Sequence, residues 1–198
     1  VDFAAWCTYK YLNSSQGGIG GVFIHERYAE ADLPRFAGWW GHKEEARFAM
    51  DPKFRPEYGA EGWMLSNSEI LSLAAHRAAL AVFQEAGPEQ VFEKRKHLTG
   101  YLAFLLNSVQ SAEGKPSFTI ITPEEHHKRG AQLSILVHEA PHDLFNTLKE
   151  NNIVVDYREP NVIRVAPAPL YNSYEEVYKF YEVVAAHFEE QAVSAQKA

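Results

Sequence analysis

The sequence predicts a mixed α/β protein in which the last strands of one sheet are followed by a separate α+β unit. Its 198 residues are 46% hydrophobic and 23% charged, an ordinary balance for one or two globular domains. Strand-like segments fill residues 1–25, whereas helical and strand-like segments alternate from about residue 115. Residues 1–25 do not fit the pattern of the later unit, so we expect them to complete a sheet whose other strands precede them.

The first elements are two strands and a long loop. Residues 1–8 and 22–25 are apolar, which predicts short strands. The glycines of residues 17–21 fit a tight turn better than a dinucleotide-binding loop or a P-loop, because the required third glycine and the following helix are missing. Residues 26–66 are rich in Gly, Pro and Trp, and a loop of this length is usually functional.

Two helices are expected after the loop. Ser66 and Glu69 have capping-box spacing, and the apolar residues that follow them recur at helical intervals as far as Gly87. Pro88 suits the first turn of a second helix, which is expected to run to about Ser111.

The remaining residues predict a mostly antiparallel sheet with helices on one face. Residues 114–116 (Gly-Lys-Pro) predict a turn. Ser173 and Glu176 form a second capping box, which opens a C-terminal helix that is expected to end near residue 191. The other expected elements are strands at residues 118–122, 132–138, 153–157 and 161–166 and a helix at residues 141–150.

Composition excludes several classes of protein. The net charge of −7 disfavours a protein that binds nucleic acid or an anionic membrane, but it leaves room for a locally basic pocket that takes a small anion. No apolar run approaches the ~18 residues of a membrane span, and no secretory signal is visible. A single cysteine, Cys7, cannot form an internal disulfide, which favours a reducing, cytoplasmic location.

Lys10 is the first candidate for chemistry. It stands between Tyr9 and Tyr11 in an apolar segment, and an amine removed from water there could form a Schiff base with an aldehyde such as pyridoxal phosphate. The competing interpretation is a lysine whose ammonium group reaches solvent from a loop.

Aromatic and amide side chains in or next to the long loop are further candidates. Trp39, Trp40 and His42 form a cluster between glycines that could stack on a planar ligand or pack under its own loop. Asn67 is expected at a helix start, where it could help to hold an anion or serve as a residue of the cap.

Arg164 is the most informative residue of the second half. It interrupts an apolar strand, so its charge needs either an internal carboxylate or the carboxylate of a substrate. His126 and His127 have no partner at ligand spacing, which predicts a solvated loop, and no metal site is expected. Cys7 is expected to be a buried thiol of the core.

Several blocks of this sequence, in order, resemble the kynureninase family. They are residues 2–13 (Asp-Phe-Ala-Ala-Trp-Cys-Thr-Tyr-Lys-Tyr-Leu-Asn), the glycines of 17–21 with 23–26 (Phe-Ile-His-Glu), 38–42 (Gly-Trp-Trp-Gly-His), 47–48 (Arg-Phe), 65–67 (Leu-Ser-Asn) and 164–173 (Arg-Val-Ala-Pro-Ala-Pro-Leu-Tyr-Asn-Ser). The resemblance covers the whole chain and corresponds to the C-terminal half of the family.

The resemblance implies the aminotransferase-like fold, fold type I, of pyridoxal-phosphate enzymes. Residues 1–66 would then be the end of the large cofactor-binding domain with an active-site loop, residues 67–114 connecting helices, and residues 115–198 the α+β small domain. The implied reaction is hydrolysis of L-kynurenine, or 3-hydroxykynurenine, to anthranilate, or 3-hydroxyanthranilate, and L-alanine.

The resemblance also implies roles for the residues that match its motifs. Lys10 would carry the pyridoxal 5'-phosphate, and Tyr9 would contact its phosphate and relay a proton. Trp39 and Asn67 would reach the phosphate region from a neighbouring subunit, so that a homodimer shares its active sites. Arg164 would bind the α-carboxylate of the substrate.

His42 and Trp40 would lie near the aryl end of the substrate. Phenylalanine can occur in relatives where this chain has Trp40, which bears on the choice of aryl group. The N-terminal half of the family supplies the partner of the pyridine nitrogen and the ring that stacks on the cofactor, so the chain alone would be inactive. The alternatives are another fold type I enzyme, such as a class V aminotransferase or a cysteine desulfurase, and a truncated fragment without catalytic activity.

Overall fold

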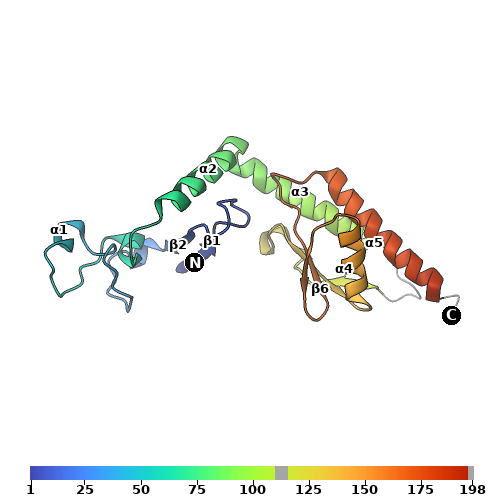
Figure 1. Ribbon diagram of the computed structural model, residues 1–198, viewed down its shortest axis with the longest axis horizontal. Helices are drawn as coiled ribbons and strands as arrows, with labels where there is room; N and C mark the ends of the chain where they lie inside the picture. Colours follow the sequence, from blue (N-terminus) through green and yellow to red (C-terminus); the bar gives the residue numbers. More distant parts are fainter. Residues whose placement is uncertain (110–115, 196–198) are drawn as a thin grey trace. The chain divides into compact units, whose positions relative to one another are not determined.

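The chain divides into two compact units, Val1–Glu85 and Ala86–Ala198, in the computed structural model (Figure 1). The structure describes residues 1–109 and 116–195. The prediction of three segments, with boundaries at residues 66 and 114, stays a prediction, and the turn expected at residues 114–116 lies mostly outside the described residues.

Unit 1 is built on a two-stranded antiparallel hairpin. Strand β1 (Phe3–Cys7) pairs with β2 (Gly20–Ile24) in a register that places Phe3 opposite Ile24 and Cys7 opposite Gly20. The expected tight turn between the strands is confirmed, and Gly17 adopts a φ of 74°, which favours glycine. Cys7 is half-buried, so the expectation of a buried thiol is wrong.

The long loop of unit 1 contains only short helices. They are the 3-10 helices η1 (Glu26–Tyr28) and η2 (Gly59–Trp63) and the single turn α1 (Glu44–Arg47). Phe3 joins the loop to the hairpin, because its ring lies 5.0 Å from the ring of Tyr28 and 5.5 Å from that of Trp63, measured between centroids.

The next helix, α2 (Ile70–Ala86), begins later than the sequence predicts, and the first capping box is not formed. The hydroxyl of Ser66 donates to the side chain of Asn67, and the carboxylate of Glu69 accepts instead from Ser72. Helix α2 has no buried residue, and several of its large apolar side chains are exposed.

Unit 2 begins with helix α3 (Pro88–Asn107) and contains a four-stranded antiparallel sheet of order β3-β4-β6-β5. Its elements are β3 (Phe118–Ile120), β4 (Leu133–Val137), α4 (Pro141–Glu150), β5 (Asp156–Arg158), β6 (Val162–Val165) and α5 (Tyr174–Ala195). The short 3-10 helix η4 (His126–Lys128) lies in the connection between β3 and β4. The predicted antiparallel sheet is confirmed.

The hydrophobic core of unit 2 lies where α3, α4 and α5 pack against the sheet. Alternate residues of β4, namely Leu133, Ile135 and Val137, are at most 2% exposed, as expected for one face of a strand. The second capping box is confirmed, because Glu176 N–H donates to the Ser173 hydroxyl and Ser173 N–H donates to the Glu176 carboxylate. Residues 153–155, expected in a strand, have no strand pairing, although Ile153 packs against the core with its side chain.

Candidate functional site

Two buried hydroxyls fix the loop that carries Lys10. Thr8, at the end of β1, and Ser14 are both almost fully buried, and their hydroxyl groups are hydrogen-bonded to each other. The Ser14 N–H donates to the Thr8 carbonyl at 3.1 Å, and the Thr8 hydroxyl also donates to the carbonyl of Ile19. Residues 9–13 are therefore closed into a short loop whose two ends are held together.

The side chain of Lys10, in this loop, is exposed to solvent and is not removed from water as the sequence had allowed. Its amine lies 5.8 Å from the centroid of the Tyr9 ring, and it forms no ion pair with any described residue. The backbone nearby is strained, because Asn13 and Ser15 have φ values of 58° and 69° without being glycines. The result is an accessible primary amine on a backbone that is tightly constrained.

The Gly-Trp-Trp-Gly-His segment is pressed against the end of the long loop. A Cβ atom on Gly38 would overlap the backbone of Met64 and Leu65, and one on Gly41 would lie 2.7 Å from the Met64 carbonyl oxygen. The Gly41 N–H donates to that same oxygen at 3.0 Å. Both glycines are therefore required by close approach of two backbones, and they set where the tryptophans between them lie.

Arg47 holds both tryptophans from one side. The carbon at the centre of its guanidinium lies 5.2 Å from the ring centroid of Trp39 and 4.6 Å from that of Trp40. The same group donates to the Trp40 carbonyl at 2.9 Å and to the His42 carbonyl at 3.0 Å. Phe48 adds an edge-on contact to Trp39 with centroids 5.4 Å apart. The two indoles nevertheless remain 49% and 38% exposed, so they are held in place and still open to a ligand.

His42 is the buried member of this cluster, with 8% of its surface exposed. Its Nδ1 accepts a hydrogen bond from the Arg55 N–H at 3.1 Å, and its ring packs on Phe54. A nitrogen that accepts cannot carry the proton of a neutral imidazole, so the proton is on Nε2. That N–H has no hydrogen-bond partner within residues 1–109 or 116–195 and is available as a donor.

Asn67 follows the segment that packs on the tryptophan loop. It is exposed and precedes the first residue of α2 by three positions, so the expectation that it stands at the helix start is wrong.

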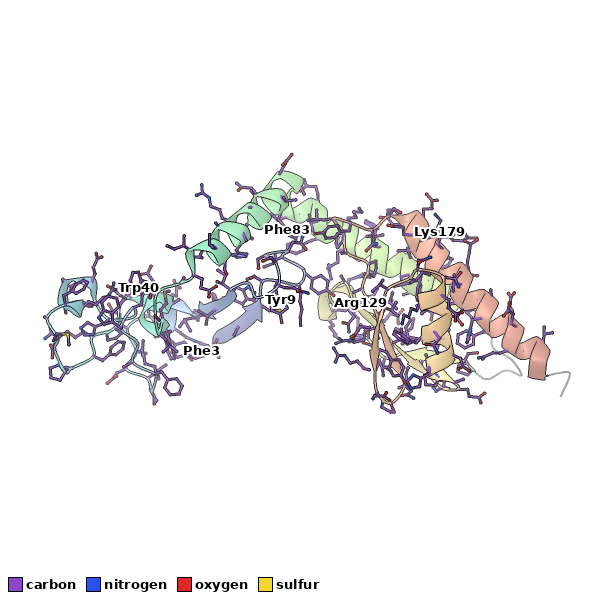
Figure 2. The ribbon with its side chains drawn as sticks, viewed as in Figure 1. Phe3, Tyr9, Trp40, Phe83, Arg129 and Lys179 are labelled. Carbon is purple, nitrogen blue, oxygen red and sulfur yellow. The ribbon has the colours of Figure 1, made fainter. Side chains whose placement is uncertain are left out.

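In Figure 2, Tyr9 and Trp40 lie at opposite ends of the β1–β2 hairpin, so unit 1 does not bring the Lys10 loop and the tryptophan loop together.

Arg164 lies in unit 2 and is already paired. Asp156 stands directly opposite it in the β5–β6 register, and its carboxylate accepts from both Nε and Nη2 of Arg164. Arg158 donates to the same carboxylate oxygen at 2.9 Å. Burial alone would raise the pKa of Asp156, but the hydrogen bonds from the two arginines outweigh it and hold that pKa below its usual value. Of the two partners that the sequence allows for Arg164, the internal carboxylate is thus present. The role of Arg164 in binding the substrate carboxylate stays a prediction.

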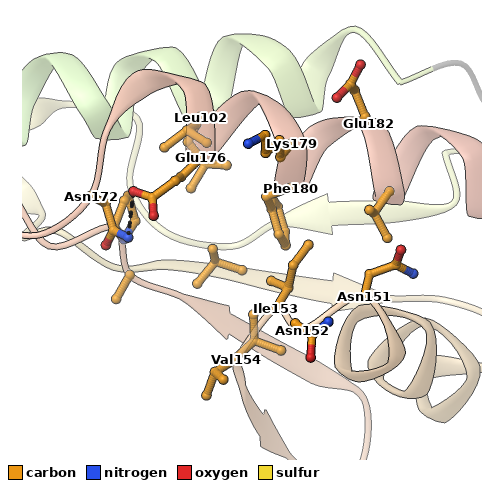
Figure 3. Close-up of a pocket in the computed structure, with 16 residues that line it drawn as sticks. Leu102, Asn151, Asn152, Ile153, Val154, Asn172, Glu176, Lys179, Phe180 and Glu182 are labelled. Atoms are coloured by element: carbon orange, nitrogen blue, oxygen red, sulfur yellow. Dashed lines mark hydrogen bonds between the residues drawn. The ribbon is translucent and has the colours of Figure 1, made fainter.

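A cavity of about 670 Å³ lies in unit 2 beside α5 (Figure 3). Its wall is mostly apolar, with Phe180 reaching into it and Asn172 hydrogen-bonded to Glu176 at its edge. The titratable residues that line it are Glu176, Lys179 and Glu182, all on α5. None of the site residues predicted from the sequence lines this cavity.

Residues 1–109 and 116–195 contain no group of three or more His, Cys, Asp and Glu side chains placed to hold a metal ion. No helix in the described part of the chain is both long and apolar enough to cross a bilayer.

Sequence reasoning missed three residues that shape these sites. Arg47 could have been found as an arginine close in sequence to an aromatic loop, where cation–π contacts are common. The sequence did not indicate the role of Ser14, because a serine that is buried by a tertiary contact cannot be distinguished in sequence from an exposed serine in a turn. Asp156 could have been found by pairing the two expected strands as a hairpin, which places it opposite Arg164.

Known sequences identify what this chain is similar to. Residues 91–184 match the family described as "Kynureninase C-terminal domain". The chain is 50% identical over 93% of its length to a kynureninase of Flavobacterium johnsoniae, and 52% identical over 94% to one of Koribacter versatilis. Each match covers 43% of the relative, so the chain spans less than half of the length of these relatives. The resemblance to the C-terminal half of kynureninases is confirmed.

Solved structures confirm the fold. A cysteine desulfurase from Escherichia coli superposes on 98% of this chain with a TM-score of 0.70 and 17% identity, and the match covers 47% of that protein. A phosphoserine aminotransferase from Cytophaga hutchinsonii matches 93% of this chain and 49% of its own, with a TM-score of 0.61 and 13% identity. Over the part that it covers, the chain has the fold type I of pyridoxal-phosphate enzymes, as the family resemblance implies.

Proposed function

We propose that this chain is the C-terminal half of a kynureninase, which hydrolyses L-kynurenine or 3-hydroxykynurenine to the corresponding anthranilate and L-alanine. The observation that carries the proposal is the identity of about 50% to kynureninases over 93% of the chain. The structural neighbours support the same fold and a pyridoxal-phosphate cofactor, because one of them, a cystine C-S lyase mutant, carries glycine covalently linked to that cofactor.

The residues present fit pyridoxal 5'-phosphate. Lys10 offers an exposed amine without an ion-pair partner among the described residues, which suits an amine that must bond to an aldehyde. The indole N–H of Trp39 and the amide of Asn67 are polar groups on exposed side chains, which suits the recognition of a phosphate. When bound, the cofactor supplies an electron sink for charge that develops at the α-carbon of the substrate.

Lys10 acts as the base at that α-carbon. The loop closed by Thr8 and Ser14 holds its backbone, so the amine moves only through its own side-chain torsions. Tyr9 adjoins it and holds the phosphate with its hydroxyl. A general base must stay within hydrogen-bond reach of the proton it takes, and a constrained loop maintains that reach.

Trp39 and Asn67 serve the site of a neighbouring subunit in a homodimer. The placement of Tyr9 and Trp40 at opposite ends of the hairpin supports this arrangement, because one unit alone would leave the tryptophan loop far from its own Lys10 (Figure 2). The loop would then act on the lysine of the partner.

Trp40 and His42 bind the aryl ketone end of the substrate. The exposed face of Trp40 offers a surface for the aromatic ring, and the Nε2–H of His42 donates a hydrogen bond to the ketone oxygen or the ring substituents. This combination of a flat apolar surface and one donor favours an aromatic ketone over a small aliphatic amino acid.

Arg164 binds the α-carboxylate of the substrate. Its guanidinium is planar and suits a two-point contact with a carboxylate. Asp156 occupies part of that fork in the structure, so binding requires Arg164 to share or exchange its partner. Arg158 would keep Asp156 compensated during the exchange, because it donates to the same oxygen.

The N-terminal half of the enzyme is the expected partner of unit 1. Large apolar side chains of this unit are exposed, among them Phe36 at 85%, Ile70 at 81% and Leu71 at 85%, whereas the hydrophobic core of the described chain lies in unit 2. Exposed apolar surface of this extent marks an interaction site. The single cysteine supports a cytoplasmic location.

A product assay separates this proposal from the alternatives. The chain is combined with the N-terminal half of a kynureninase and pyridoxal phosphate, and it is offered kynurenine or cysteine. Anthranilate and alanine from kynurenine support the proposal, whereas sulfide from cysteine would point to a cysteine desulfurase. An assembly that forms and binds the cofactor but turns over neither substrate would refute it.

A further inference from the structure

Two arginines of unit 2 meet at the connection between β3 and β4. Arg95, on α3, donates from Nη1 to the backbone carbonyl of Arg129 at 2.6 Å. Arg129, labelled in Figure 2, donates to the carbonyl of Pro123 at 3.2 Å and lies 3.5 Å from Nδ1 of His126. The Arg95 guanidinium of a long helix thus contacts the backbone of a loop more than twenty residues away, in which the Arg129 guanidinium lies next to the His126 ring.

Neither arginine has a negative partner. Within residues 1–109 and 116–195 no carboxylate forms an ion pair with Arg95 or Arg129, and their partners are carbonyl oxygens and His126. The Nε atoms of both side chains are covered by protein and have no hydrogen-bond partner in the described chain. Half-buried guanidinium groups without a negative partner destabilise the folded protein. An anion that binds between them would remove this cost.

Two carboxylates close in sequence to these residues already have lysine partners. Glu125 accepts from Lys128 at 2.6 Å, and Glu93 accepts from Lys96 at 3.3 Å. Glu93 and Glu125 therefore do not compensate the charges of the two arginines.

We propose that Arg95, Arg129 and His126 form a binding site for an oxyanion, either a carboxylate or a phosphate group. Guanidinium groups match the planar spacing of such oxygens, and the remaining Nη donors of Arg95 are free to contact them. The site lies entirely within unit 2 and uses none of the residues assigned to the proposed reaction. A test that refutes the proposed reaction would therefore leave this proposal unaffected, and the reverse also holds.

Calorimetric titration of the full chain tests the site. Inorganic phosphate and acetate are titrated separately at constant ionic strength, which removes general charge screening. We expect at least one of them to bind, and Arg129→Gln and Arg95→Gln each to weaken that binding tenfold or more. Arg158→Gln is the matched control, because Arg158 is an arginine of the same unit that is paired with Asp156, and its variant should bind within twofold of the wild type.

The two probes distinguish the source of the oxyanion. If only the binding of phosphate is weakened by the arginine substitutions, the site takes a phosphate group, and if only the binding of acetate is weakened, it takes a carboxylate. If an arginine variant fails to fold, His126→Gln replaces it, because that side chain is exposed, and a threefold or greater loss is expected. Absence of binding by both anions, or binding that these substitutions leave unchanged, would overturn the proposal.

Discussion

Arg47 is predicted to be the residue that keeps the tryptophan loop in its binding conformation. Replacing it by methionine removes the guanidinium and keeps a flexible apolar side chain of similar length. The change abolishes the contacts with the rings of Trp39 and Trp40 and the hydrogen bonds to the carbonyls of Trp40 and His42. We expect the segment of residues 38–42 to open more often while the rest of unit 1 keeps its hydrogen bonds.

The size of the effect follows from these contacts. Each of the two cation–π contacts contributes roughly 0.5–1 kcal/mol at a partly exposed site. The hydrogen bonds to two carbonyls add about 1 kcal/mol net, because water replaces them when they are lost. The sum is about 2–3 kcal/mol, which corresponds to roughly a 30- to 150-fold increase in the population of the open loop.

Amide hydrogen exchange measures this population directly. The amides of Gly41 and Lys43 are the reporters, since they donate to the carbonyls of Met64 and Arg55 and exchange only when the loop opens. Arg55→Met is the matched control, because the Arg55 side chain pairs with Asp51 and not with the tryptophans, so less than a threefold change is expected. Equal exchange in the two variants would refute the positioning role of Arg47.

Three further predictions follow from the same structure. In an assembly of both halves, Lys10→Ala should abolish the cofactor adduct that borohydride fixes to the chain, and a normal yield would show that another lysine carries it. Mixing that variant with a Trp39/Asn67 double variant should restore some activity through hybrid dimers, and no recovery despite proven subunit exchange would place both residues in their own subunit's site. Burial lowers the pKa of His187 from 6.5, more than its acidic neighbours raise it, so the unfolded chain binds the extra proton first and stability should fall as the pH drops below about 6.5. His187→Gln should flatten that part of the curve of melting temperature against pH, and an unchanged slope would contradict the assignment.

The regular elements of unit 2 were predictable because local pattern and burial agree there. Leu133, Ile135 and Val137 alternate in sequence and are buried on one face of β4. Ser173 and Glu176 form the capping box that their spacing predicts, although Asn172 also donates to the Glu176 carboxylate. In such segments the local preference and the tertiary contacts favour the same structure.

The same spacing failed at the first capping box, where both side chains bond to other residues. Ser66 and Glu69 have the spacing of Ser173 and Glu176, yet they bond to Asn67 and Ser72, and α2 begins at Ile70. Spacing alone does not say which of several nearby donors a carboxylate will accept from.

The tertiary contacts of the candidate site lay beyond any local pattern. Motifs singled out Trp39, Trp40 and His42, but only the structure shows that Arg47 lies across the indoles and that Arg55 fixes the tautomer of His42. Such contacts depend on the path of an irregular loop, which no periodicity encodes.

Substitutions of Arg164 test whether one side chain can serve both an internal ion pair and the binding of the substrate carboxylate. In Arg164→Leu, Asp156 keeps its hydrogen bond to Arg158, and Leu suits the apolar strand. The lost pair is partly exposed, with side-chain exposures of 34% and 46%, so it contributes at most about 1 kcal/mol. For a chain of this size that lowers the melting temperature by roughly 2–4 °C or less.

Activity should respond much more strongly than stability if Arg164 binds the substrate carboxylate. Removing a charge-assisted fork costs on the order of 2–5 kcal/mol in kcat/KM, and Arg164→Lys should recover only part of it because a lysine lacks the planar pair of donors. Asp156→Asn supplies the complementary measurement: it frees the guanidinium from its internal partner, so KM should not rise if the two carboxylates compete for Arg164. A strongly destabilised Arg164→Leu protein whose folded fraction retains ordinary kcat/KM would instead assign Arg164 to the β5–β6 hairpin alone.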